Sequence, residues 1–321
     1  MPLFSAFPAR SAAILPTLAR NCSHNGTIYS LGTTRSRCYK RPAARGIGKL
    51  PLVQIVVLAA VQGLTEFLPI SSSGHLILVP ALASYAGADW PDQGLAIDVA
   101  THVGTLAAVL VYFWRDVGRM AGGFAGLLVG RLTPGGRLAG FLLIGTVPAL
   151  DVGFLVDRYV GAGLRRMDIV AWTMIGFGVV LYAADRLGLT VRRLEHMTLF
   201  HAVVVGCAQA FAFVPGTSRS GITMVAARLL GYERAEAARF SFLLSIPAIA
   251  AAGLWKGLEV VRGGDPQILD AALTAAALSA LAGFLAIAVL MRWLRHSTFT
   301  PFVIYRLGLG AVLLYLVYMG G

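Results

Sequence analysis

Apolar runs of about the length that crosses a bilayer recur from Pro51 to the C-terminus, separated by short gaps that contain arginine. A spanning helix needs about 17 to 25 predominantly apolar residues. Only 13% of the 321 residues are charged, whereas a soluble domain carries about 25%. These features exclude a water-soluble globule and predict an all-α polytopic membrane protein.

The first fifty residues differ from the rest, because they hold eight Lys or Arg and no acid. They lack the apolar stretch of a secretory signal. We expect residues 1–50 to be a basic N-terminal extension, either disordered or not native, and residues 51–321 to form the membrane-embedded domain. Setting the eight charges aside reduces the formal net charge from +12 to +4. No basic stripe with interleaved aromatic residues is visible, which disfavours a nucleic-acid partner.

Ten apolar segments follow Pro51, and four of them form two pairs that are each broken by a polar Pro/Gly/Ser turn. The second member of each pair is too short to cross ~30 Å of hydrocarbon at 1.5 Å per residue. The pairs therefore predict two re-entrant helical hairpins, and the other six segments predict spanning helices. The paired segments are 52–69 with 76–86 and 198–214 with 222–231, and the spanning ones are 98–113, 138–156, 169–184, 237–255, 268–291 and 302–319.

The two breaks resemble each other, and they align at an offset of 146 with one inserted residue before the final glycine. Each hairpin is followed by three crossings, so the chain returns to the membrane from the opposite side. This pattern predicts an inverted repeat, with repeat one at 52–184 and repeat two at 198–319. The tips of the two hairpins are then expected to meet near the midplane and to share one site.

Loop charges predict the orientation. The gaps at 114–137, 185–197 and 292–301 hold nine Lys or Arg, and those at 157–168 and 256–267 hold five. Because cytoplasmic loops accumulate basic residues, we expect the first set to be cytoplasmic. The first hairpin then enters from outside and the second from inside.

The first break carries residues suited to phosphate chemistry. Gln62 and Glu66 lie one helical turn apart on one face, and an ionisable residue inside a membrane segment suggests a functional site. Ser71, Ser72, Ser73 and His75 follow, at the start of a new helix whose N-terminus favours anions. One of these serines is expected to cap that helix.

The second break places Arg219 among hydroxyls and glycines at another helix start. A guanidinium binds phosphoryl oxygens through two parallel hydrogen bonds and keeps its charge. We expect this segment to clamp a phosphate. The expected phosphate-binding residues of the two breaks are Ser71, Ser73, Thr217, Ser218, Ser220 and Thr223.

Residues Gln62–His75 and Pro215–Gly221 resemble the two signature motifs of the undecaprenyl-diphosphate phosphatase family, also called bacitracin-resistance proteins. The resemblance extends from about Leu52 to the C-terminus and does not include the first fifty residues. It implies an enzyme of the bacterial plasma membrane that hydrolyses undecaprenyl diphosphate to undecaprenyl phosphate, the lipid carrier of peptidoglycan synthesis. It also implies a site that opens to the outer side.

By this resemblance the catalytic residues are Glu66, Ser72, His75 and Arg219. The family also implies a divalent cation, Mg²⁺ or Ca²⁺, for which Glu66 and Gln62 are the candidate ligands. Many members have Glu where this chain has Gln62, so only one carboxylate is available here. The oligomeric state stays open, with a homo-oligomer as one option.

Two alternatives follow from the sequence. The nucleophile is Ser72, His75 or water. A transporter or flippase of polyprenyl phosphate is the competing function, since inverted repeats with broken helices also build transporters.

Overall fold

The computed structural model describes residues 51–85, 87, 90, 94–159, 164, 166–263 and 266–319. The predicted N-terminal extension lies outside these residues. The described residues form α-helices, two short 3₁₀ helices and one isolated β-bridge between Arg192 and Tyr232. The predicted all-α class is thus confirmed. The elements are α2 (Leu52–Phe67), α3 (Ser72–Tyr85), α4 (Gly94–Tyr112), α5 (Trp114–Leu128), α6 (Pro134–Tyr159), α7 (Met167–Leu187), η2 (Leu194–His196), α8 (Leu199–Gln209), η3 (Ala210–Phe213), α9 (Arg219–Leu229), α10 (Arg234–Gly263), α11 (Pro266–Trp293) and α12 (Thr300–Met319).

Six helices, namely α4, α6, α7, α10, α11 and α12, are long and apolar enough to cross a bilayer. They correspond to the six segments predicted to span. The two remaining pairs, α2 with α3 and α8–η3 with α9, are shorter helices joined at the two predicted breaks. Their depth in a bilayer stays a prediction.

The gap predicted at 114–137 is not simply a loop, because α5 occupies most of it. This helix was missed because its apolar residues alternate with charges and glycines, so no continuous apolar run marks it. Such a pattern is typical of a helix with one apolar face. Asp116 of α5 forms an ion pair with Arg239 of α10, with 2.6 Å between Oδ1 and Nη2.

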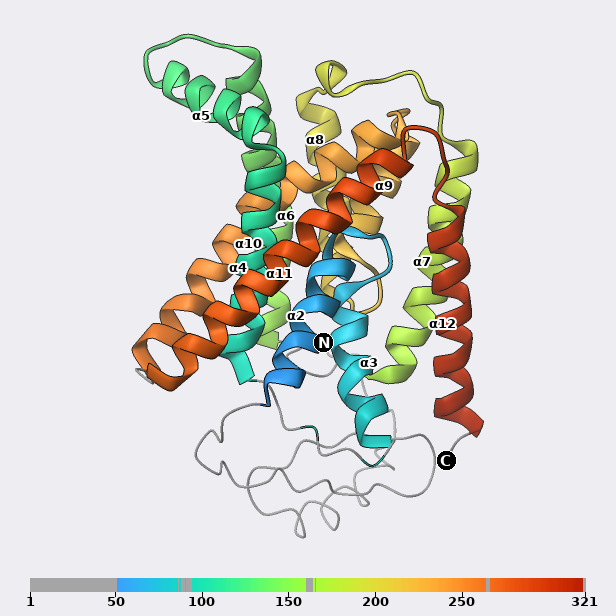
Figure 1. Ribbon diagram of the computed structural model, residues 1–321. Coiled ribbons are helices and arrows are strands. Elements are labelled where there is room, and N and C mark those ends of the chain that lie inside the picture. The colour runs from blue at the N-terminus through green and yellow to red at the C-terminus, as the bar shows by residue number, and fades with distance from the viewer. Residues whose placement is uncertain are drawn as a thin grey trace, which may run out of the picture. The chain divides into compact units, whose positions relative to one another are not determined.

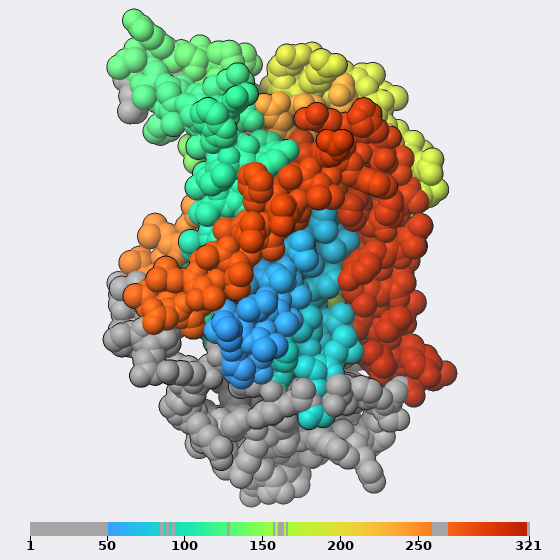
Figure 2. Space-filling view, in the orientation of Figure 1, coloured from blue at the N-terminus to red at the C-terminus, as the bar shows by residue number. Residues whose placement is uncertain are grey.

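The two halves of the chain pack on each other reciprocally. In Figure 1, α2 and α3 rise from the lower end of the bundle, and α8 descends from the upper end. Helix α2 lies against α11 of the second half, and α8 lies against α6 of the first half. Figure 2 shows α11 running diagonally across this face with α2 beside it. Each pair of short helices therefore packs against the opposite half of the chain, and the inverted repeat stays a prediction.

The two breaks share one unusual backbone conformation. Ser71 and Ser218 each have φ of 76°, and they are the non-glycine residues with positive φ in the described chain. A positive φ is sparsely populated by residues that have a Cβ, and it costs such a residue roughly 1–3 kcal/mol. The equivalence of Ser71 and Ser218 makes the local offset 147. The inserted residue predicted before the final glycine therefore lies upstream, where Gly216 and Thr217 stand opposite Ile70.

Candidate active site

Residues from both breaks meet on the carboxylate of Glu66. Gln62 donates from Nε2 to Oε2 of Glu66 at 2.8 Å, and the Ser72 hydroxyl donates to the same oxygen at 2.7 Å. Arg219 donates from Nη2 to Oε1 at 2.9 Å. The exposed fraction of the side chain is 6% for Glu66 and 15% for Arg219. The two breaks therefore do meet, and they share a partly buried ion pair.

The local sequence explains why these groups converge. Gln62 and Glu66 are four residues apart on α2, so they project from one face. Ser72 is the first residue of α3 and Arg219 is the first residue of α9. Since Ser71 and Ser218 are equivalent, Ser72 and Arg219 occupy equivalent positions in the two repeats. Three of the four predicted catalytic residues are thus brought into direct contact.

Ser71 and Ser218 act as matching caps of the two short helices. Gly74 donates its N–H to the Ser71 hydroxyl at 3.3 Å, and Gly221 donates its N–H to the Ser218 hydroxyl at 3.1 Å. The hydroxyl of Ser71 also contacts that of Ser73 at 3.3 Å, and the hydroxyl of Ser218 contacts that of Ser220 at 3.2 Å. Capping therefore accounts for one serine in each break, as the sequence predicted for the first.

The remaining predicted phosphate-binding residues differ in their surroundings. Ser220 donates to the carbonyl oxygen of Leu68 at 3.1 Å, which ties the second break to the first. The hydroxyls of Thr223 and Ser241 lie 2.7 Å apart. Thr217 is buried, and its hydroxyl has no hydrogen-bond partner among the described residues. A buried hydroxyl without a hydrogen-bond partner costs free energy of folding. Within this set, Thr217 therefore gains most from a hydrogen bond to a ligand.

His75 lies in the first turn of α3 but bonds away from Glu66. A carbonyl oxygen only accepts, so His75 Nδ1 donates to the Ser71 oxygen at 2.6 Å. In the neutral imidazole Nε2 is then an acceptor, and the Tyr305 hydroxyl donates to it at 2.6 Å. The two rings are stacked with 5.6 Å between their centroids. The Tyr305 hydroxyl thus forms a hydrogen bond with the imidazole nitrogen of His75 that Ser71 does not bind.

The described residues hold no group of three or more His, Cys, Asp or Glu suited to a metal. Gln62 Oε1 is nevertheless buried beside Glu66 and has no hydrogen-bond partner among the described residues. Mg²⁺ is usually held by one or two carboxylates together with substrate phosphates. An orphaned amide oxygen next to one carboxylate fits a cation of that kind.

Comparison with known proteins decides the family. The family described as "Bacitracin resistance protein BacA" matches residues 55–312. This chain belongs to the BacA family. The family membership predicted from the two sequence motifs is therefore confirmed.

Three relatives illustrate the closeness of this BacA-family chain to curated proteins. It is 51% identical to "Undecaprenyl-diphosphatase 1" of Rhodospirillum rubrum over 271 residues, which are 84% of this chain and 96% of the relative. It is 49% identical to "Undecaprenyl-diphosphatase" of Jannaschia sp., over 84% of this chain and the whole relative. It is 48% identical to "Undecaprenyl-diphosphatase" of Hahella chejuensis, over 83% of this chain and 98% of the relative.

One residue of this BacA-family chain was not assigned to the site from sequence although it touches both breaks. Arg306 of α12 is 1% exposed and donates to Pro69 in the first break and to Gly216 and Thr217 in the second. Further bonds reach the carbonyl oxygens of Thr173 and Met174, and the five distances run from 2.8 to 3.3 Å. Arg306 could have been assigned to the site from the sequence, because it is an arginine inside an apolar segment, which was the argument applied to Arg219.

Proposed function

We propose that this protein hydrolyses undecaprenyl diphosphate to undecaprenyl phosphate and inorganic phosphate. The reaction recycles the lipid carrier of peptidoglycan synthesis and confers resistance to bacitracin. The observation that carries the proposal is the Glu66 carboxylate, which is bound by Ser72 from one break and by Arg219 from the other. The BacA family match and the names of the relatives support the same reaction.

The chemistry breaks the bond between the terminal phosphorus and the bridging oxygen. A new bond forms from that phosphorus to the oxygen of water, directly or after transfer to an enzyme group, and undecaprenyl phosphate leaves. Enzymes catalyse phosphoryl transfer mainly by positioning and by stabilising charge. Arg219 uses two of the five N–H donors of a guanidinium, on Glu66 and on the Ser241 carbonyl. The other donors are available for phosphoryl oxygens, together with the N-termini of α3 and α9.

The short bond between Ser72 and Glu66 gives the serine a base within reach. A nucleophile and its base usually lie about 2.6–3.2 Å apart, and the two side-chain oxygens here are 2.7 Å apart. His75 offers a second nucleophile or acid/base group through Nε2 once the Tyr305 hydroxyl moves aside. Water oriented by Glu66 is the third route.

A divalent cation, Mg²⁺ or Ca²⁺, belongs to this proposal, with Glu66 and the free amide oxygen of Gln62 as its protein ligands. When bound, it would neutralise part of the charge on the diphosphate. The remaining protein groups still have to bind and orient the phosphoryl group, which is the role given to Arg219 and to Thr217.

The protein is a multi-pass membrane protein, and we place it in the bacterial plasma membrane with the site open to the outer side. The connection before α6, the α7–α8 connection and the α11–α12 connection lie at one end of the bundle (Figure 1). These are the three gaps that hold the excess of arginine, which supports a cytoplasmic location for that end.

Phosphate release from undecaprenyl diphosphate in detergent, with Mg²⁺ present, tests this function. We expect the wild type to release phosphate and Arg219→Ala to lose about 10²–10³-fold in kcat, as expected when a main donor to a developing charge is removed. Arg292→Ala is the control, because Arg292 is exposed at the end of α11, away from both breaks. Loss of activity in both variants would contradict the assignment of Arg219.

The competing flippase makes the opposite prediction. If the wild type released no phosphate while Arg219→Ala still altered lipid translocation in liposomes, the phosphatase would be wrong. Rapid-quench trapping with labelled substrate distinguishes the nucleophiles. An acid-labile, base-stable label assigns His75, an acid-stable label assigns Ser72, and no label in a single turnover assigns water.

A further inference from the structure

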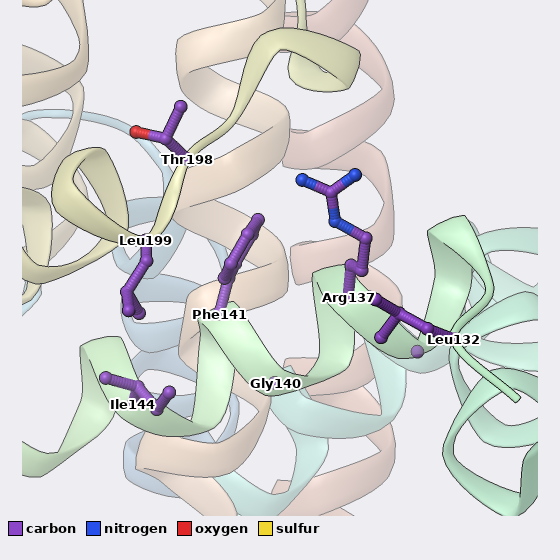
Figure 3. A pocket seen from close by; sticks show the side chains of 8 residues that line it. Leu132, Arg137, Gly140, Phe141, Ile144, Thr198 and Leu199 are labelled. Atoms are coloured by element: carbon purple, nitrogen blue, oxygen red, sulfur yellow. The ribbon is translucent and has the colours of Figure 1, made fainter. Parts of the chain in front are cut away.

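A groove lies at the upper end of the bundle, where α6 and α8 begin, and it shares no residue with the two breaks. Its volume is about 430 Å³. Figure 3 shows Phe141, Ile144 and Leu199 along its apolar part, with the guanidinium of Arg137 at its rim on the side of Phe141 away from Thr198 and Leu199. The groove therefore has one basic end and one apolar end.

The surface of α6 is hollowed here by a glycine. Arg137, Gly140, Phe141 and Ile144 follow the spacing of one helix face. A Cβ added to Gly140 would meet nothing within 4 Å. Packing inside the protein therefore does not require glycine at this position, and the space lies open to a molecule from outside.

The positive charge of Arg137 at the rim is not neutralised by any other residue that lines the groove. No acid is among its lining residues, and Arg137 forms no ion pair with a described residue. Its guanidinium lies over the ring of Phe141, 5.9 Å from the ring centroid. A guanidinium in this setting is suited to a phosphate, which it binds with two parallel hydrogen bonds.

The direction of the groove matches that of a lipid. Arg137 lies in the first turn of the spanning helix α6, and Ile144 lies seven residues further, about 10 Å deeper at 1.5 Å per residue. Charge thus sits at the membrane surface, and apolar side chains continue toward the hydrocarbon. Ile144 is 45% exposed and Leu199 is 48% exposed, so both present apolar surface to an acyl chain.

We propose that this groove binds an anionic glycerophospholipid, with its phosphate on Arg137 and an acyl chain along Phe141, Ile144 and Leu199. Basic pockets between membrane helices bind phospholipid headgroups by the same chemistry. The groove is separate from the site at the hairpin tips. The proposal therefore does not depend on the phosphatase reaction.

Native mass spectrometry of the purified full chain, titrated with phosphatidylglycerol, tests the proposal. We expect Arg137→Ala to weaken binding of one lipid roughly fivefold, the effect of one basic residue near an anionic lipid. Gly140→Leu is expected to remove that binding by filling the groove. Arg186→Ala is the matched control, since Arg186 also stacks on an aromatic ring, that of Tyr182 at 5.2 Å, at the same end of the bundle but outside the groove.

Three outcomes would overturn the proposal. Equal binding by wild type and Arg137→Ala would show that the arginine holds no lipid. Equal losses in Arg137→Ala and Arg186→Ala would indicate a general charge effect. Equal binding of phosphatidylcholine, or binding of undecaprenyl phosphate alone, would assign another ligand. If Gly140→Leu failed to fold, the exposed Arg137→Ala would still decide, and the melting temperature of each variant in detergent reports its folding.

Discussion

Arg219 and Glu66 form an ion pair, so a phosphate that binds Arg219 has to share the guanidinium with Glu66. A buried carboxylate and guanidinium are costly to desolvate singly but tolerable as a pair. In the proposed reaction a phosphoryl oxygen binds the remaining donors of Arg219 and shares its charge with Glu66, which is then a stronger base for Ser72 or water and a better ligand for a cation. One ion pair thus contains both the proposed phosphate-binding group, Arg219, and the proposed base, Glu66.

Tyr305 is predicted to position His75, because its hydroxyl donates to the one imidazole nitrogen left free by Ser71. Tyr305→Phe keeps the ring stack and removes the hydrogen bond, worth about 1 kcal/mol. We expect kcat for phosphate release to fall roughly fivefold with KM unchanged. Tyr315→Phe, an exposed tyrosine on the same helix, is the control. A rise in KM with constant kcat would place Tyr305 in substrate binding instead.

Gln62 gives a test of the cation. Gln62→Glu supplies a second carboxylate beside Glu66, and the affinity of such sites rises with the number of charged ligands. We expect the Mg²⁺ concentration for half-maximal activity to fall about tenfold. Gln62→Met, similar in size but without charge, is expected to show no such fall. An unchanged Mg²⁺ dependence in Gln62→Glu would remove residue 62 from the cation site.

At the scale of elements, close helix contacts in this fold depend on glycine. A Cβ on Gly206 of α8 would lie 2.1 Å from the carbonyl oxygen of Gly145 on α6, so the two helices would have to separate. Small residues allow such contacts between membrane helices. We expect Gly206→Ala to destabilise the protein by about 1–3 kcal/mol and to lower its melting temperature in detergent.

Gly176 of α7 is the matched control, because a Cβ there would meet nothing within 4 Å. Gly176→Ala is expected to stabilise by up to about 1 kcal/mol, since alanine has the higher helix propensity. The two substitutions should thus shift the melting temperature in opposite directions. A similar shift for both would mean that the contact between α6 and α8 is not limiting.

The sequence predicted the spanning helices well because length and hydropathy determine them. Glu66 and Arg219 stood out because charged groups are rare in apolar segments, and the resemblance to the family added Ser72. The catalytic roles of these three residues stay a prediction. The sequence did not reveal α5, whose register of charges and glycines hides a helix from a search for apolar runs. It did not assign the bond between Tyr305 and His75, which are 230 residues apart. Contacts of this kind depend on how the two halves pack, and no local pattern encodes that packing.

For the whole molecule, the arrangement of loops predicts a testable topology. In a chain whose native cysteines are replaced, Thr190→Cys at the arginine-rich end should be protected from a membrane-impermeant thiol reagent in intact cells. Gly87→Cys, beyond the C-terminus of α3 at the other end, should react. Both residues lie outside the helices. Labelling of Thr190→Cys alone would reverse the proposed orientation.

The reciprocal seating of the hairpins also bears on how the protein is made. Gly63 of α2 lies against Ser279 and Ala282 of α11, so close that a Cβ would be 2.6 Å from atoms of both. During synthesis α2 and α3 leave the ribosome first, and α11 follows about two hundred residues later. During that interval α2, which leads into the first polar break, lacks the α11 surface against which it packs. The site can therefore assemble only after α11 has been synthesised. A nascent chain stopped before α11 would contain Glu66 on an α2 helix that lacks its packing partner.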